Sequence, residues 1–298
     1  MYYYSFSNKF RKIVETKKNK IAIKIDDSNY YTFKKLDFIS NSIADQIIKK
    51  KIKINEVIVI EAKKKLETYA AIIACLKVGC PYVLIDFSQP ISRVKKILLR
   101  CEAKICLSYG DKKNFIFQSF KKSLILNNLK FLDKNFIKVH KRSEKVVSST
   151  PAYIMFTSGS TGFPKGAIIT HQNILNFSLW AKDEYNLDDK DIITNVNPLY
   201  FDNSVFDIYS SILNGIKLII FNQTETSEPL KLIKKILKNK CSVWFSTPSL
   251  LIYLINYKLI TKNNFKHIKK IIFGGEGFPK NKLKELMKIL GKNKRFYN

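Results

Sequence analysis

The chain has 298 residues, of which 46% are hydrophobic and 13% aromatic, and its formal net charge is +29. This length and apolar content exclude a disordered chain and suffice for one large domain or two smaller ones. The sequence has neither a signal-peptide pattern nor an apolar run long enough to span a bilayer, so we expect a cytoplasmic protein without membrane insertion.

The positive charge is spread over polar positions along the whole chain. A net charge this positive can indicate that the protein binds a nucleic acid or an anionic membrane surface. No zinc-finger or RNP motif accompanies the lysines. We therefore expect non-specific attraction of polyanions and no specific nucleic-acid partner.

The five cysteines are an odd number in a long chain, which argues against a disulfide framework. Cys75 and Cys80 are separated by four residues, and so are Cys101 and Cys106. Zinc ligands with such a spacing lie in tight polar turns, whereas these cysteines lie in apolar segments. We expect buried, inert thiols and no metal site.

The predicted elements alternate between helices and strands. In the first 110 residues we expect helices at 6–18, 34–50 and 66–79, and strands at 21–26, 30–33, 56–62 and 82–86. Residues 111–150 have weaker periodicity, with one strand at 123–128. From Pro151 onward we expect strands at 152–157, 192–197, 216–221, 241–246, 268–275 and 295–298, and helices at 169–185, 204–215, 228–240, 248–257 and 281–292. Repeated strand–helix–strand units predict an α/β fold with parallel sheets sandwiched by helices, and no linker separates autonomous domains.

Three of the ten glycines fall within TSGSTGFPKG, residues 157–166, which follows an apolar strand and is expected to precede a helix. Backbone N–H groups exposed by glycines, with hydroxyls beside them, form a nest that suits phosphate oxygens, and Lys165 would add a positive charge. Pro164 stands where the Walker A pattern requires glycine, which excludes a P-loop kinase or GTPase. The alternative is an ordinary connection between a strand and a helix.

The longer segment YIMFTSGSTGFPKGAIITHQNI resembles the signature loop of the adenylate-forming superfamily. That superfamily includes adenylation domains of nonribosomal peptide synthetases, acyl-CoA ligases and D-alanine–carrier protein ligases. Two earlier segments, YYTFKKLDFISNSIADQI and LKVGCPYVLIDFSQPISRV, resemble its first and second core motifs. The resemblance implies that the β- and γ-phosphates of ATP are bound by Thr157, Ser158, Gly159, Ser160, Thr161, Gly162 and Lys165.

The segment NPLYFDNSVFDIY contains the pattern FDxS and resembles the branch of the superfamily that activates amino acids. This implies that Asp202 pairs with the α-ammonium group of the substrate, with Phe201 and Phe206 on either side. A cation in an apolar site needs such a carboxylate partner. The alternative for Asp202 is a helix N-cap.

Two further segments, SVWFSTPSLL and IIFGGEGFP, resemble the D-alanine-activating ligases and their peptide-synthetase relatives. The resemblance implies that Phe245, Ile272 and Gly274 line the acyl pocket, and that Gly275 and Glu276 lie near the nucleotide. A tight strand-to-helix turn is the alternative for the glycines. In D-alanine ligases a cysteine is usual at the position of Gly274. D-alanine is therefore not assigned as the substrate, and the resemblance implies only a small amino acid.

The last residue, Asn298, resembles the first residue of the motif that cradles adenine and ATP in this superfamily. The resemblance implies that residues 1–298 are the N-terminal portion of an adenylation domain. The small C-terminal lid domain and its catalytic lysine would lie beyond the chain end, so we assign no catalytic residue and expect the chain alone to be poorly active or inactive.

The implied reaction uses ATP and Mg²⁺ to convert a small amino acid to its aminoacyl-adenylate, and then loads it onto the phosphopantetheine thiol of a carrier protein. The missing C-terminal half as a separate chain is a further expected partner. Two alternatives remain open: a fragment of an acyl- or aryl-CoA ligase, and a non-catalytic remnant that binds polyanions non-specifically.

Overall fold

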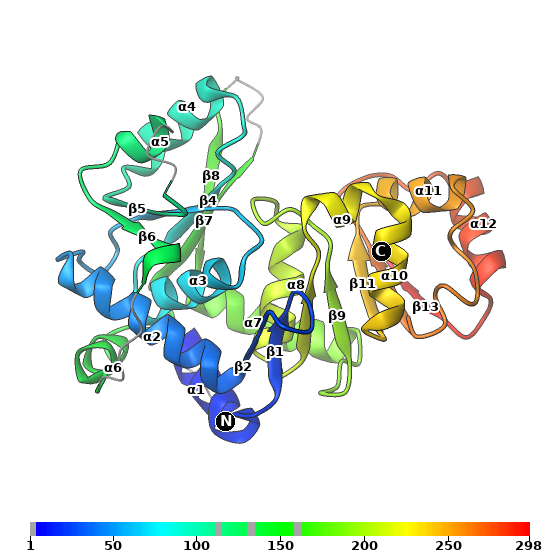
Figure 1. Ribbon diagram of the computed structural model, residues 1–298, viewed down its shortest axis with the longest axis horizontal. Helices are drawn as coiled ribbons and strands as arrows, with labels where there is room; N and C mark the ends of the chain where they lie inside the picture. The colour runs from blue at the N-terminus through cyan, green and yellow to red at the C-terminus, as the bar shows by residue number, and fades with distance from the viewer. Residues whose placement is uncertain (1–3, 111–114, 130–134, 158–162) are drawn as a thin grey trace. The chain divides into compact units, whose positions relative to one another are not determined.

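The computed structural model describes residues 4–110, 115–129, 135–157 and 163–298 (Figure 1). The chain, expected to be one domain, divides into two units, each with its own parallel sheet. The first unit contains Met1–Lys20 and Tyr31–Phe177, and the second contains Ile21–Tyr30 and Ser178–Asn298. A short N-terminal segment therefore belongs to the C-terminal unit.

The first unit has a six-stranded sheet in the order β6-β5-β3-β4-β7-β8, in which only the β7–β8 pair is antiparallel within the described ladders. Its strands are β3 (Ile58–Glu61), β4 (Tyr82–Ile85), β5 (Ile105–Ser108), β6 (Ser123–Ile125), β7 (Pro151–Thr157) and β8 (Lys165–Thr170). All four residues of β3 are buried, as expected for a central strand covered on both faces. The helices are α1 (Phe6–Lys17), α2 (Phe33–Lys49), α3 (Leu66–Val78), α4 (Ile91–Cys101), α5 (Phe115–Gln118), α6 (Ile137–Ser143) and α7 (His171–Glu184), which continues into the second unit.

Local sequence explains where the helices of this unit begin and end. The hydroxyl of Thr32 accepts a hydrogen bond from the Lys35 N–H at 3.2 Å and caps α2. Gly79 ends α3 in the left-handed region at φ 66°, where a Cβ atom would lie 2.9 Å from Val146 Cγ2. Both the backbone conformation and the close approach therefore require glycine at this position.

Lys77 is one of the buried lysines of the first unit. The Lys77 ammonium donates to Asp37 Oδ1 at 2.7 Å, Ser40 Oγ at 2.8 Å and Asn41 Oδ1 at 2.6 Å. Burial lowers the pKa of Lys77, and the neighbouring Asp37 carboxylate opposes this shift. The hydrogen bonds satisfy the charge where α3 packs against α2.

The second unit has a seven-stranded sheet in the order β13-β12-β11-β9-β10-β1-β2. Its strands are β1 (Ile21–Lys24), β2 (Tyr30–Thr32, of which only Tyr30 is counted in this unit), β9 (Ile192–Asn195), β10 (Lys217–Ile220), β11 (Val243–Ser246), β12 (Lys270–Phe273) and β13 (Arg295–Tyr297). The ladders from β13 through β1 are parallel. The helices are α8 (Asn203–Ile212), α9 (Gln223–Ser227), α10 (Pro229–Lys238), α11 (Pro248–Asn256) and α12 (Lys280–Leu290).

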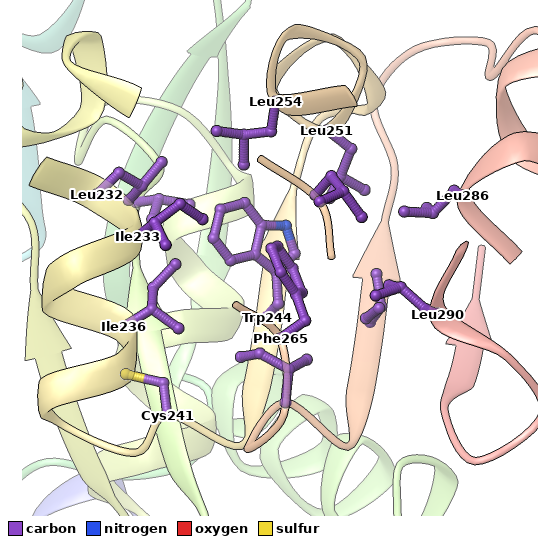
Figure 2. Close-up of a cluster of buried hydrophobic side chains, with 14 of the residues drawn as sticks. Leu232, Ile233, Ile236, Cys241, Trp244, Leu251, Leu254, Phe265, Leu286 and Leu290 are labelled. Atoms are coloured by element: carbon purple, nitrogen blue, oxygen red, sulfur yellow. The ribbon is translucent and has the colours of Figure 1, made fainter. Parts of the chain in front are cut away.

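The core on one face of this sheet is centred on Trp244 (Figure 2). The Trp244 ring lies 5.9 Å from the Phe265 ring, and its Nε1 donates to Ser246 Oγ at 2.8 Å. Leucine and isoleucine side chains from α10, α11 and α12 surround the two rings. Where β9 and β12 begin, a buried ion pair joins Lys270 Nζ to Asp191 Oδ2 at 2.5 Å.

The predicted α/β fold with parallel sheets and helices is confirmed. Four helices, α4, α5, α6 and α9, and the strand β5 are not among the predicted elements. In α4, Val94, Ile97 and Cys101 recur at helical spacing and are buried, so a signal was present. The helix α9 has no buried residue, so its sequence lacks the apolar periodicity from which a helix is predicted.

The predicted buried thiols are confirmed, because all five cysteines are free and buried. Burial raises the pKa of Cys80 and of Cys241 to about 12 in each case, so neither thiol ionises at neutral pH. In the described ranges, no helix is both long and apolar enough to cross a bilayer.

Candidate phosphate hairpin and amino-acid site

The predicted phosphate loop joins the two strands of a β-hairpin. Thr157, at the end of β7, lies opposite Lys165, the first residue of β8. The prediction that this loop precedes a helix is wrong, because β8 intervenes and α7 begins only at His171. Ile168, Ile169 and Thr170 are β-branched and pair with β7, which favours a strand there. The strand β8 therefore separates the end of the loop from the N-terminus of α7.

Ser158, Gly159, Ser160, Thr161 and Gly162 lie outside the described residues. The two described ends of the loop are both exposed, and the Thr157 hydroxyl donates to the Lys165 carbonyl at 3.5 Å. Within the described part of the chain, the Lys165 ammonium has no carboxylate within ion-pair distance.

Sequence reasoning missed two cations of α4 beside the hairpin. The Lys96 ammonium lies 4.6 Å from the centroid of the Phe163 ring, and the Arg100 guanidinium carbon lies 6.0 Å from it. A pocket of about 420 Å³ on the hairpin is lined by Arg100, Phe163, Pro164 and Lys165 among others. Positive charge from two segments of the chain thus gathers where the loop ends, which suits an anionic ligand.

In the second unit, Asp202 occupies the N-cap position of α8, but its side chain makes no capping hydrogen bond. The turn is held instead by the Ser204 hydroxyl, which donates to Leu199 O at 3.0 Å and to Phe201 O at 2.7 Å. Asp202 is exposed, and its carboxylate has no ion-pair partner among the described residues. Asp202 therefore does not cap α8 through its side chain, which was the alternative to substrate binding.

The structure brings most of the predicted acyl-site residues together. Phe206 is 3% exposed, and its ring meets the Phe245 ring edge to face at 5.1 Å. Phe245 and Ile272 are paired across β11 and β12. A Cβ atom at Gly274 would lie 3.9 Å from Phe245 Cε2, its nearest neighbour, so there is space beside this glycine. Phe201 is 52% exposed and contacts the Tyr200 ring at 4.7 Å.

Three further aromatic residues extend this set, and the sequence analysis did not find them. The Tyr185 ring lies 5.4 Å from Phe206, 4.9 Å from Tyr297 and 5.4 Å from Trp180. Burial raises the pKa of Tyr185, so its hydroxyl stays neutral. We refer to Trp180, Tyr185, Phe206, Phe245 and Tyr297 as the aromatic cluster.

Gly275 and Glu276 form the turn after β12. Gly275 has φ 87°, and a Cβ atom there would lie 3.5 Å from Asn203 Nδ2, next to Asp202 in the chain. The Glu276 carboxylate accepts hydrogen bonds from the Ser249 N–H at 3.3 Å and from the Ser249 hydroxyl, in the first turn of α11. Only Oε2 of the Glu276 carboxylate thus accepts these two hydrogen bonds. Asn298 follows β13 and is exposed.

The chain is similar to curated ligases. The chain is 29% identical over 259 residues to the D-alanine–D-alanyl carrier protein ligase of Bacillus cytotoxicus, covering 86% of this chain and 51% of that ligase. It is also 29% identical over 246 residues to the L-proline–[L-prolyl-carrier protein] ligase of Streptomyces coelicolor, covering 76% of this chain and 46% of that ligase. The chain thus spans about half the length of these curated relatives.

The fold is shared with solved structures. The N-terminal subdomain of Klebsiella oxytoca NpsA, in complex with 3-hydroxyanthranilyl-AMSN, matches with a TM-score of 0.84 at 17% identity, covering 99% of this chain and 72% of that one. The family described as AMP-binding enzyme matches residues 10–298. The chain therefore belongs to the AMP-binding enzymes, a family of ATP-dependent, adenylate-forming ligases.

Proposed function

We propose that this chain is the part of an amino-acid-activating ligase that holds the ATP phosphates and a small amino acid. The complete reaction would form an aminoacyl-adenylate and transfer the aminoacyl group to the phosphopantetheine thiol of a carrier protein. The observation that carries the proposal is the exposed Asp202 carboxylate, which makes neither a cap nor an ion pair among the described residues.

Asp202 suits an ammonium ligand. A carboxylate beside an aromatic surface binds a cationic group more strongly than in bulk water, because water is partly excluded there. Phe206 follows Asp202 by four positions in the chain, and Phe206 packs against Phe245. The substrate ammonium would pair with Asp202 while its side chain contacts Phe245, Ile272 and Gly274. The two phenyl rings already fill part of this surface, which favours a small amino acid.

The hairpin would bind the phosphates. Lys165 would pair with a phosphate oxygen, and Arg100 and Lys96 would add positive charge beside it. The hydroxyls and backbone N–H groups would come from Thr157, Ser158, Gly159, Ser160, Thr161 and Gly162. Gly275, Glu276 and Asn298 remain proposed contacts of the nucleotide.

We propose that ATP binds together with Mg²⁺. Within the described residues no three potential metal ligands gather, but Mg²⁺ bound to nucleotide phosphates needs only one or two protein carboxylates. Glu276 could supply one, because only its Oε2 atom is engaged by Ser249. When bound, Mg²⁺ would neutralise charge on the phosphates.

The carrier-protein step is supported by relatives rather than by the geometry. Two relatives are ligases for a D-alanyl carrier protein and for an L-prolyl-carrier protein. Tyrocidine synthase 3 of Brevibacillus parabrevis is 26% identical over 301 residues, which are 99% of this chain and 4% of that synthase. A carrier protein is therefore the acceptor we propose. The remainder of the ligase, as a separate chain, is a further proposed partner.

The test compares two non-hydrolysable analogues of the adenylate, alanyl- and propionyl-sulfamoyl adenosine, which differ only in the ammonium group. We expect the alanyl analogue to bind more tightly, and Asp202→Asn to weaken it by about tenfold or more because a charge-assisted hydrogen bond is lost. Isothermal titration measures both affinities without requiring turnover.

The propionyl analogue is the control, and its affinity should be the same for Asp202→Asn as for the original chain. Equal weakening of both analogues would show that Asp202 only supports the local structure. Tighter binding of the propionyl analogue by the original chain would favour an acyl- or aryl-acid ligase instead.

A further inference from the structure

A second pocket lies in the first unit, lined by residues of α1, α2, α3 and α6. Its volume is about 410 Å³, within the range of about 300–1,000 Å³ that is usual for small-molecule sites. None of its lining residues belongs to the hairpin or the aromatic cluster. The proposed ligase function therefore leaves this pocket without a role.

One wall of the pocket is a single face of α1. The lining positions on this helix and its C-cap recur at intervals of three and four residues, and they are Ser7, Phe10, Arg11, Val14, Glu15 and Lys18. Val139 of α6 also lines the pocket. The lining thus combines apolar side chains, of which Val14 is the most accessible, with polar groups and exposed cations.

Three exposed cations of the lining have no carboxylate partner within the described part of the chain: Arg11, Lys18 and Lys34. The Lys34 N–H donates to the Lys18 carbonyl at 2.9 Å, which places the two lysines side by side. Adjacent like charges repel, so an anion between them would be stabilising.

The two carboxylates that line the pocket are already engaged. Asp37 accepts from the buried Lys77 ammonium at 2.7 Å. Glu15 lies 3.6 Å from Lys12 Nζ. Neither carboxylate therefore neutralises these three cations.

The lining of the pocket includes a buried polar group without a hydrogen-bond partner among the described residues. The Ser7 side chain lines the pocket, the residue is 4% exposed, and its buried hydroxyl makes no hydrogen bond in the described structure. Buried hydroxyls are normally hydrogen-bonded, so this one marks a position for a polar atom of a ligand or for a water.

We propose that this pocket binds a small organic anion, with a carboxylate or phosphate group at Arg11, Lys18 and Lys34 and an apolar body against Val14. The site is separate from the one proposed for ATP and amino acid. Binding there would tie α1 to α2 and α6, and so stabilise the first unit.

The test uses three probes with the same ring: phenyl phosphate, benzoate and neutral benzyl alcohol. Titration followed by protein NMR or calorimetry should show one saturable site for at least one anion and none for benzyl alcohol. We expect Arg11→Gln combined with Lys34→Gln to weaken the anion by about tenfold or more, because both substitutions remove charge-assisted hydrogen bonds. Whether phosphate or carboxylate binds more tightly identifies the anionic group.

The matched control is Lys190→Gln combined with Lys262→Gln, which removes the same charge at exposed positions of the second unit. Equal weakening by both double variants would overturn the proposal in favour of non-specific attraction to a basic protein. Absence of saturable binding by either anion would also overturn it. Circular dichroism confirms that the exposed substitutions leave the fold intact. Failure of this test would leave the Asp202 experiment unaffected, because that experiment uses different ligands and residues.

Discussion

The phosphate hairpin and the aromatic cluster are built in opposite ways. In β8, the four residues from Lys165 to Ile168 are all exposed, so the hairpin presents charge and backbone to solvent. In the cluster, Phe206 and Tyr185 are 3% and 8% exposed, and each ring contacts another ring. The cluster is therefore held by the core of the second unit, whereas the hairpin depends little on packing. We expect substitutions in the cluster to affect stability, and substitutions in the hairpin to affect only ligand binding.

The largest effect is expected for Phe206→Ala. Removal of a buried phenyl ring should lower the free energy of unfolding by about 3–5 kcal/mol, because it removes buried surface and leaves a cavity. Both tryptophans, Trp180 and Trp244, belong to the second unit, so their fluorescence during urea unfolding reports on this unit.

Phe201→Ala is the control for this measurement, because Phe201 is the same residue type but 52% exposed. It should cost less than about 1 kcal/mol. Similar losses for the two variants would mean that the cluster does not support the fold as described.

A somewhat smaller effect is expected from pH, and it should separate the units. Burial lowers the pKa of His171 in the first unit to about 4, while its Nδ1 accepts from the Phe6 N–H at 3.1 Å. The unfolded chain, with a histidine pKa near 6.5, binds the proton more readily than the folded chain does. This contribution to stability is therefore complete above about pH 6.5, and about 3 kcal/mol of it is lost as the pH falls to about 4.

Far-UV circular dichroism during urea unfolding at several pH values measures this dependence. His171→Gln should flatten the slope between pH 6.5 and 4. His267→Gln, at a much less buried histidine of the second unit, should leave the slope nearly unchanged. A slope that persists in His171→Gln would assign the acid sensitivity to other groups.

The smallest change in stability is expected for Lys165→Gln, within about 0.5 kcal/mol, because the side chain is exposed. The affinity for a non-hydrolysable ATP analogue should nevertheless fall by about tenfold or more, since a charged contact to phosphate is lost. Calorimetry measures the affinity and thermal unfolding measures the stability. Lys262→Gln serves as the charge-matched variant. An unchanged affinity in Lys165→Gln would remove this lysine from the proposed phosphate site.

The contrast between the two sites also explains what the sequence could predict. The phosphate loop is a run of ten consecutive residues whose hydroxyls, glycines and lysine indicate its chemistry directly. Its hairpin form was missed because β8 is exposed over most of its length, so KGAIIT lacks the alternation of apolar and polar residues that marks a half-buried strand.

The aromatic cluster could be predicted only in part. Phe206 and Phe245 lie in segments with a recognisable resemblance, whereas Trp180, Tyr185 and Tyr297 do not. The ring contacts depend on the order of strands in the sheet, where β11 lies between β9 and β12. That order is a property of the whole unit and leaves no local pattern in the sequence.

Two of the buried lysines, one in each unit, can serve as internal reporters. The side chains of Lys77 in the first unit and Lys270 in the second are only 6% and 8% exposed, and each ammonium is held by a carboxylate. An amine-acylating reagent reacts with accessible, deprotonated lysines, so it should label the many surface lysines quickly and leave these two unmodified in the folded chain. Mass-spectrometric footprinting would then follow the opening of each unit separately, by the acylation of a single residue.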